Sequence, residues 1–94
     1  MQSKKQVISG LIYEARQRSE DLDESTDLIQ DRSHWAAYVH QQLGEGSELS
    51  RYEADNDDGT LNTIDDPGDR LTFAKNLYAK DAQRLADIRR NLAG

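Results

Sequence analysis

The sequence predicts an all-α fold, a small bundle of three main helices, and two observations carry that prediction. Apolar residues recur at spacings of three and four, which is the period of an amphipathic helix rather than the alternation of a strand. Proline occurs once, at a position where a helix can begin. We expect the helices over about residues 3–18, 26–43 and 67–92, with an acidic loop between the second and the third.

The first helix is predicted by one apolar stripe, which consists of Val7, Ile8, Leu11, Ile12 and Ala15. The polar stretch "SEDLDESTD" follows it. Within this stretch, Ser25, Thr26 and Asp27 are residue types that cap the N-termini of helices, so the second helix is expected to begin there.

The second helix is predicted by a stripe on one face, formed by Leu28, Trp35, Val39 and Leu43. Gly44 follows the last of these residues, and glycine commonly ends helices. A short helical turn is expected next, at "SELSRYEA", where it would pair Leu49 with Tyr52.

The third helix has the clearest start, because Asp66 can cap it and Pro67 suits the first helical position. Its apolar seam consists of Leu71, Ala74, Tyr78, Leu85, Ile88 and Leu92. Asp81 falls on this seam and needs a partner there, for which Lys80 and Arg84 are nearest in the sequence. A helix of this length either packs along both other helices or extends into a partner subunit.

Length and charge limit the class of protein. Ninety-four residues predict a single domain, residues 1–94, with a core so small that a homo-oligomer is expected. The chain has no cysteine and no apolar segment long enough for a signal peptide or a membrane span, so we expect a cytoplasmic protein without membrane contact. A net charge of −6 argues against binding a nucleic-acid backbone and permits binding to a basic partner.

The stretch "ADNDDGTLNTIDDPGD" resembles the calcium loop of dockerin modules. With Gly59 at the sixth position of the loop, the oxygen ligands would be Asn56, Asp58, Asn62 and Asp65. Ala54 occupies the first position, where such a loop normally supplies a carboxylate. The structural alternative is an acidic loop in which Gly, Asn and Asp form turns.

The same region supports a second interpretation, because it carries many carboxylates and few cations. An inhibitor or adaptor could present these carboxylates to the basic groove of a partner protein. The residues expected on this acidic face are Glu48, Glu53, Asp55, Asp57 and Asp58. Charge runs are more often solvated surface, which is the alternative here.

Three segments in order resemble small phage MazG-like proteins, which belong to the all-α nucleotide pyrophosphohydrolases. The segments are "IYEARQR", "DRSHWAAYVHQQLGEGSE" and "DRLTFAKNLYAKDAQRLADIRR", and the resemblance covers about residues 7–92. It rests on an Arg-Gln pair that ends the first helix, a Trp that opens the second, and the polar motif that follows. It implies a nucleotide-binding site formed by Arg16, Gln17, Trp35, Gln41, Gln42 and Glu45.

The resemblance also implies that catalysis has been lost. The second helix of the family carries Glu-Glu-x-x-Glu, whereas "QQLGE" here replaces two glutamates with Gln41 and Gln42 and keeps only Glu45. The Glu-x-x-Asp pair of the third helix has no match in this sequence. Clustered carboxylates hold the Mg²⁺ that bridges the substrate phosphates, and a neutral glutamine cannot supply that charge.

For Trp35 and for the two histidines, a structural or surface position is an alternative to a functional role. The stripe that Trp35 shares favours a core or interface position, whereas nucleotide binding would need its ring to stack on a base. His34 and His40 are six residues apart, so on a helix they do not form the metal pair that a spacing of four provides.

Four functions remain open on this sequence. The leading hypothesis is a small acidic protein of MazG-like ancestry that binds a nucleotide or a protein without efficient catalysis. The alternatives are an acidic inhibitor or adaptor of the anti-defence type, a calcium-binding module, and a working Mg-dependent pyrophosphohydrolase. Only the last two require a metal ion, Ca²⁺ and Mg²⁺ respectively.

Overall fold

The computed structural model describes residues 2–54 and 56–92, and in this part of the chain it contains helices and no strands. The all-α prediction is therefore confirmed. The elements are α1 (Lys4–Asp21), α2 (Leu28–Leu43), α3 (Ser47–Glu53), the 3₁₀ helix η1 (Asp58–Thr63) and α4 (Pro67–Arg90).

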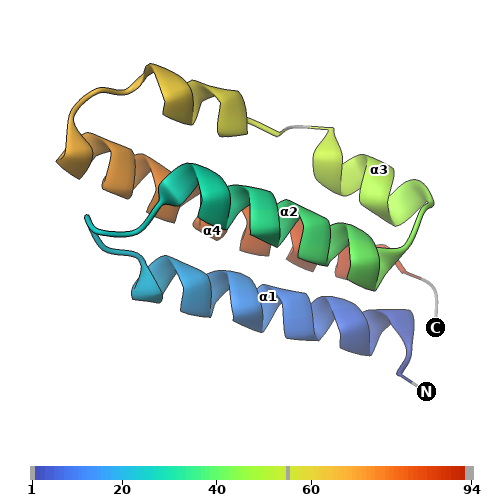
Figure 1. Ribbon diagram of the computed structural model, residues 1–94. Helices are drawn as coiled ribbons and strands as arrows, with labels where there is room; N and C mark the ends of the chain where they lie inside the picture. The colour runs from blue at the N-terminus through green and yellow to red at the C-terminus, as the bar shows by residue number, and fades with distance from the viewer. Residues whose placement is uncertain (1, 55, 93–94) are drawn as a thin grey trace.

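The helices run up and down in an elongated bundle of 45 × 22 × 19 Å (Figure 1). Two short elements take the place of a third long helix, because α3 and η1 follow one another along the outside before the chain turns into α4. The first and last helices, α1 and α4, make the most extensive contact and run antiparallel. Their ends are joined by hydrogen bonds from Lys75 Nζ to the Ser19 carbonyl oxygen and from Arg89 Nη1 to Ser9 Oγ.

Cap residues in the sequence explain where the helices begin and end. The Asp27 carboxylate accepts a hydrogen bond from the Gln30 N–H at the start of α2, and Asp66 accepts from the Asp69 N–H at the start of α4. Gly44 ends α2 with a φ of 70°, a left-handed conformation that a side chain would disfavour.

The bounds differ from the sequence prediction at several helix ends: α2 begins at Leu28 rather than near residue 26, and α4 ends at Arg90 rather than near residue 92. The first helix continues to Asp21 rather than ending near residue 18, because Leu22, which caps it, is itself buried in the core. The short turn expected at "SELSRYEA" is confirmed as α3, and Leu49 and Tyr52 are both buried. The helix η1 was not predicted, since its sequence contains turn-forming residues without helical periodicity.

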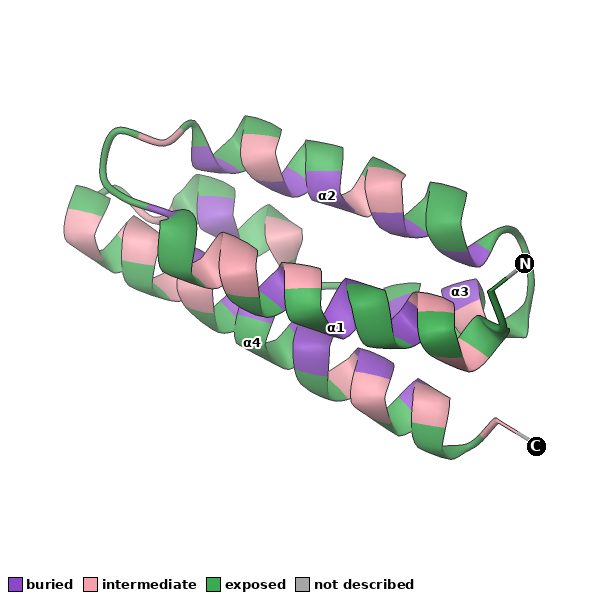
Figure 2. Ribbon diagram, turned by 90° about the horizontal axis from the view of Figure 1, so that it is seen from below, coloured by how far each residue is buried: buried purple, intermediate pink, exposed green. Residues whose placement is uncertain are grey.

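The core lies between α1, α2 and α4, and purple buried positions follow the inner sides of these helices in Figure 2. The 24 residues of α4 fit along α1 and the other elements, so packing within the chain accounts for the length of this helix. The largest fully buried side chains are Trp35, Tyr78, Ile8, Leu11, Leu61, Leu85 and Val39. None of the described helices is both long and apolar enough to cross a membrane.

Candidate functional site

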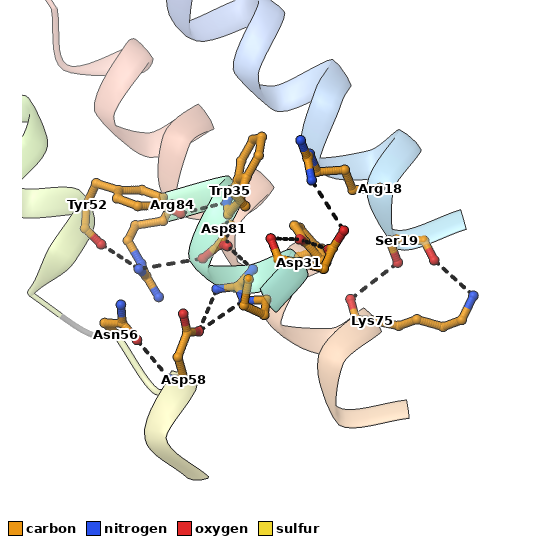
Figure 3. Close-up of polar contacts among 12 residues, drawn as sticks. Arg18, Ser19, Asp31, Trp35, Tyr52, Asn56, Asp58, Lys75, Asp81 and Arg84 are labelled. Atoms are coloured by element: carbon orange, nitrogen blue, oxygen red, sulfur yellow. Dashed lines mark hydrogen bonds and ion pairs between the residues drawn. The ribbon is translucent and has the colours of Figure 1, made fainter. Parts of the chain in front are cut away.

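A buried polar network joins α2 to α4 in the middle of the bundle, and Asp81 is its centre (Figure 3). The side chain of Asp81 is 3 % exposed. Its Oδ2 accepts hydrogen bonds from Arg32 Nη1 at 2.7 Å and from Trp35 Nε1 at 3.0 Å. Arg84 Nη1 lies 3.7 Å from the other carboxylate oxygen, so two cations and one indole donor surround this carboxylate.

Arg32 links this buried carboxylate to the acidic loop. Its Nε and Nη2 donate to one oxygen of Asp58 at 3.0 and 2.7 Å, and its guanidinium carbon lies 4.6 Å from the centre of the Tyr78 ring. Burial disfavours the charge on Arg32, but Asp81 and Asp58 together outweigh that cost and raise the pKa of its guanidinium. Arg32 therefore remains a cation that is held by two carboxylates.

The aromatic members of the network are held by hydrogen bonds of their own. Trp35 is fully buried, and its Nε1 also donates to the Tyr52 hydroxyl at 2.8 Å. Burial, with the nearby charge of Asp81, raises the pKa of the Tyr52 hydroxyl. The Tyr78 hydroxyl donates to the Asp31 carboxylate, and burial together with this hydrogen bond raises the pKa of Tyr78.

The chemistry of this network is structural, because its charges neutralise one another and its central groups are out of contact with solvent. A buried ion pair whose hydrogen bonds are satisfied fixes the relative position of the elements that carry it. Here those elements are α2, α3, η1 and α4, since the network takes residues from each of them.

The residues predicted to bind a nucleotide do not come together. Arg16 and Gln17 lie near the C-terminal end of α1, whereas Gln41, Gln42 and Glu45 lie at the C-terminal end of α2. The end of α2 meets the opposite end of α1, where Lys4 Nζ donates to the Leu43 carbonyl oxygen. From Lys4 to Arg16 the helix rises by ~18 Å, which separates the two groups.

The base-stacking role considered for Trp35 is corrected by its burial, since none of its ring surface is exposed. The core position favoured by the apolar stripe is the one observed. Gln17 instead lines a polar hollow of 410 Å³ with Arg18, Asp21, Thr26 and Asp31, and Gln42 lines a separate groove between α1 and α2.

The four residues predicted as calcium ligands lie along η1 and its flanks. Asp58 is occupied by Arg32, and Asn56 Oδ1 accepts the backbone N–H of Asp58 at 2.7 Å. Asn62 and Asp65 are exposed. Across residues 2–54 and 56–92, no three His, Asp or Glu side chains are grouped so that they could hold a metal ion. Calcium binding stays a prediction from the loop pattern.

The acidic face predicted around residues 48–58 is partly neutralised. Glu48 lies 3.8 Å from Lys4 Nζ, Asp58 pairs with Arg32, and the Asp57 carboxylate accepts from the Thr60 hydroxyl. Glu53 is exposed at the end of α3. Asp55 lies outside the described residues.

A different set of carboxylates gathers at one end of the bundle, where the turn from α1 to α2 meets the start of α4 (Figure 1). We call this the acidic end. A hollow of 380 Å³ between the two turns is lined by Glu24, Asp27 and Asp65, among others. The exposed carboxylates of the acidic end are Glu20, Asp21, Asp23, Glu24, Asp27, Asp65, Asp66 and Asp69.

Cations gather at the opposite end. Lys5, Arg89 and Arg90 line a hollow of 350 Å³ there, and Lys4 lies beside Glu48. The acidic end contains Arg70, but this side chain donates to the carbonyl oxygens of Leu61 and Ile64. Glu48 lies beside Lys4 and Asp87 pairs with Arg90, so the cations of this end are partly balanced, whereas the acidic end carries an excess of carboxylates.

Sequence reasoning missed Arg32, although a signal for it was present. Arg32 lies at a helical spacing within the stripe of Leu28, Trp35 and Val39, and this spacing places a cation on an otherwise apolar side of α2. Asp81 lies on the seam of α4 in the same manner. Two opposite charges, each on an apolar side of its helix, are the pattern of a buried ion pair.

Comparisons with models of known families, with curated proteins and with solved structures found no match to this chain. The resemblances to MazG-like proteins and to dockerin loops remain hypotheses that rest on the sequence.

Proposed function

We propose that this chain is a binding protein that acts without catalysis, and that its acidic end engages a basic surface on a protein partner. The observation that carries the proposal is the gathering of exposed carboxylates from two separate turns at one end of the bundle. Long-range attraction from such an end speeds the encounter with a positively charged surface and orients the approaching partner.

The position of the other polar groups supports binding rather than catalysis. The groups with the most perturbed environments, Arg32, Tyr52 and Tyr78, are buried and hold one another or their neighbours. A catalytic group needs contact with its substrate, and the two tyrosine side chains are buried. Arg32 borders a hollow of 200 Å³, but its guanidinium is already held by Asp58 and Asp81. Among the exposed acids of the acidic end, Asp27 and Asp66 cap helices and Asp23 accepts hydrogen bonds from Ser25 within the turn, while the others make no such bond with the described residues.

A nucleotide is the other ligand of the leading hypothesis, and the geometry favours it less. Arg16 and Gln17 lie ~18 Å along α1 from the end of that helix that the end of α2 meets, and Trp35 is buried. A protein surface can instead contact the acidic end from outside, without any rearrangement of the core.

A capture experiment with matched variants tests the proposal. The double variant Glu20→Gln/Glu24→Gln neutralises two acids of the acidic end without touching a helix cap. The double variant Glu45→Gln/Glu53→Gln makes the same change elsewhere on the surface. We expect a captured protein to bind the wild type and the second variant, to bind the first at least about tenfold more weakly, and to dissociate as salt is raised.

Two results would overturn the proposal. Equal binding by both double variants would show that the acidic end is not the contact. In a parallel thermal-shift panel, a rise in Tm with a nucleotide but with no captured basic protein would assign the chain to nucleotide binding, because a ligand that binds only the native state stabilises it.

A further inference from the structure

The helix α2 carries its charges on one side only. Its 16 residues include two charged ones, Asp31 and Arg32, and both lie toward the bundle in pairs with Arg18, Asp58 and Asp81. The exposed residues between them and the end of the helix are Ser33, His34, Ala37, His40, Gln41 and Gln42. In a chain in which 32 % of residues are charged, the outward side of this helix has no Asp, Glu, Lys or Arg.

A groove of 270 Å³ between α1 and α2 extends this uncharged surface onto α1. Gly10 and Tyr13 line it on α1, and Tyr38 and Gln42 line it on α2. Tyr13 is 64 % exposed, more than any other large hydrophobic residue that the structure describes. Glu14 is the one charged side chain among the described residues that line the groove. Depletion of charge together with exposed aromatic rings distinguishes protein interfaces from the rest of a surface.

Gly10 supplies an independent observation. It lies inside α1, where glycine destabilises a helix by ~1 kcal/mol relative to alanine. Its φ is not positive, and a Cβ built at this position would meet no atom within 4 Å. Nothing in the fold of one chain therefore requires a glycine here. A surface that approaches α1 closely from outside would require it.

We infer that this uncharged surface is where a second copy of the chain docks. We call it the neutral face and define it by Gly10 and Tyr13 of α1 and by Ala37, Tyr38, Gln41 and Gln42 of α2. In a symmetric dimer the same patch meets itself, so the patch has to match its own image. The tyrosine rings would pack over the space that Gly10 leaves open, and the glutamines would pair across the contact.

A second copy fits this surface as its occupant, because the glutamine amides and tyrosine hydroxyls can pair with their own images and no like charges meet at the contact. Each chain carries a net charge of −6, so two copies repel one another wherever acidic surface meets acidic surface. The neutral face removes that repulsion from the contact itself. A glutamine amide both donates and accepts hydrogen bonds, as does a tyrosine hydroxyl, so a surface rich in both pairs with its own copy, which carboxylates at neutral pH cannot do.

The inference is independent of the acidic end and leads to a testable change in mass. We expect the molecular mass from sedimentation equilibrium to rise from 10.7 kDa toward twice that value as the concentration rises from micromolar to millimolar. Ala37→Glu places a charge in the neutral face and should hold the protein at the monomer mass. Gly10→Glu should do the same without loss of folding, because the position is sterically open and glutamate favours a helix more than glycine does.

The matched control is Ala79→Glu, which makes the same exchange at an exposed alanine inside α4. It should associate like the wild type, and all three variants should keep the circular-dichroism spectrum of the wild-type monomer. A wild type that stays monomeric at every concentration would overturn the inference. So would association that Ala37→Glu and Ala79→Glu weaken equally, since the contact would then lie elsewhere.

Discussion

On the inner side of α2, Asp31 and Arg32 are charged and held by partners from other elements, whereas the outer side of the same helix has no formal charge. The inner side places its polar groups where solvent is scarce, and each finds a partner there: Arg32 pairs with the opposite charge of Asp81, and Asp31 accepts a hydrogen bond from the Tyr78 hydroxyl. The outer side exposes amides, histidines and small residues.

The difference shows that the two sides of one helix obey different constraints. A charge that is buried within the fold is tolerable only when a fixed counter-charge meets it, and it then specifies which elements pack together. An uncharged outer side contributes little to the stability of one chain, because its groups are equally well hydrated when the chain unfolds. Substitutions on the two sides should therefore differ strongly in their effect on the free energy of unfolding.

The largest effect is expected for Asp81→Ala on the inner side. The substitution leaves Arg32 without the more deeply buried of its two counter-charges and removes one of two acceptors from Trp35 Nε1. Breaking a buried pair in this way costs about 3–5 kcal/mol. Urea unfolding followed by tryptophan fluorescence measures the loss, with Asp81→Asn as the control that keeps an acceptor for Trp35. A loss below about 1 kcal/mol would show that the pair is not buried as described.

Alkaline pH tests the two tyrosine hydroxyls that face this side of α2. The pKa of both Tyr52 and Tyr78 is raised in the folded chain, so above about pH 10 the unfolded chain loses these protons first. The contribution of these two hydroxyls to the free energy of unfolding is therefore fully present below that pH. It falls as the pH rises, by about 1.4 kcal/mol per pH unit for each tyrosine. Urea unfolding at a series of pH values measures the slope. Tyr52→Phe should remove one tyrosine's share of it, and an unchanged slope would contradict this assignment.

A smaller effect is expected for Asp58→Asn, at the edge of the network. The side chain of Asp58 is 26 % exposed, so water compensates for part of the lost interaction with Arg32. We expect the free energy of unfolding to fall by about 1 kcal/mol. We also expect the substitution to accelerate amide hydrogen exchange more in η1 than in α1. Equal acceleration of exchange in both helices would mean that Asp58 stabilises the whole bundle and not only α3 and η1.

The smallest effect is expected for Gln41→Ala on the outer side of α2. Gln41 is exposed and makes no described hydrogen bond through its side chain, so the free energy of unfolding should change by less than about 0.5 kcal/mol. The measurement is made at low concentration, so that any association between chains does not contribute to the free energy of unfolding. If Gln41→Ala lowered the free energy of unfolding as much as Asp58→Asn does, the two sides of α2 would not differ in their contribution to stability.

The sequence was sufficient to predict features that depend on neighbours along the chain. Helical periodicity predicted the three main helices, and the capping residues Asp27 and Asp66 predicted where two of them begin. The burial of Trp35 followed from its place in an apolar stripe. The prediction that Asp81 needs a partner was confirmed, although its closest cation is Arg32 and not Arg84.

The rest depends on contacts between residues far apart in the sequence. Asp81 and Arg32 are separated by 49 positions, and no local pattern specifies which elements meet. The residues predicted to bind a nucleotide lie apart for a simple reason. Two antiparallel helices joined by a short turn place their C-terminal ends at opposite ends of the bundle, so Arg16 and Gln41 could not lie together.

The extensive contact between α1 and α4 has a consequence for how the chain is made. The ribosome releases α1 before α4, and synthesis proceeds at roughly 5–20 residues per second. For several seconds α1 has its apolar stripe exposed, with α2 and α3 present but without the helix that covers most of it. A nascent chain that stalls before residue 67 therefore presents to chaperones and proteases a surface that the finished protein never shows.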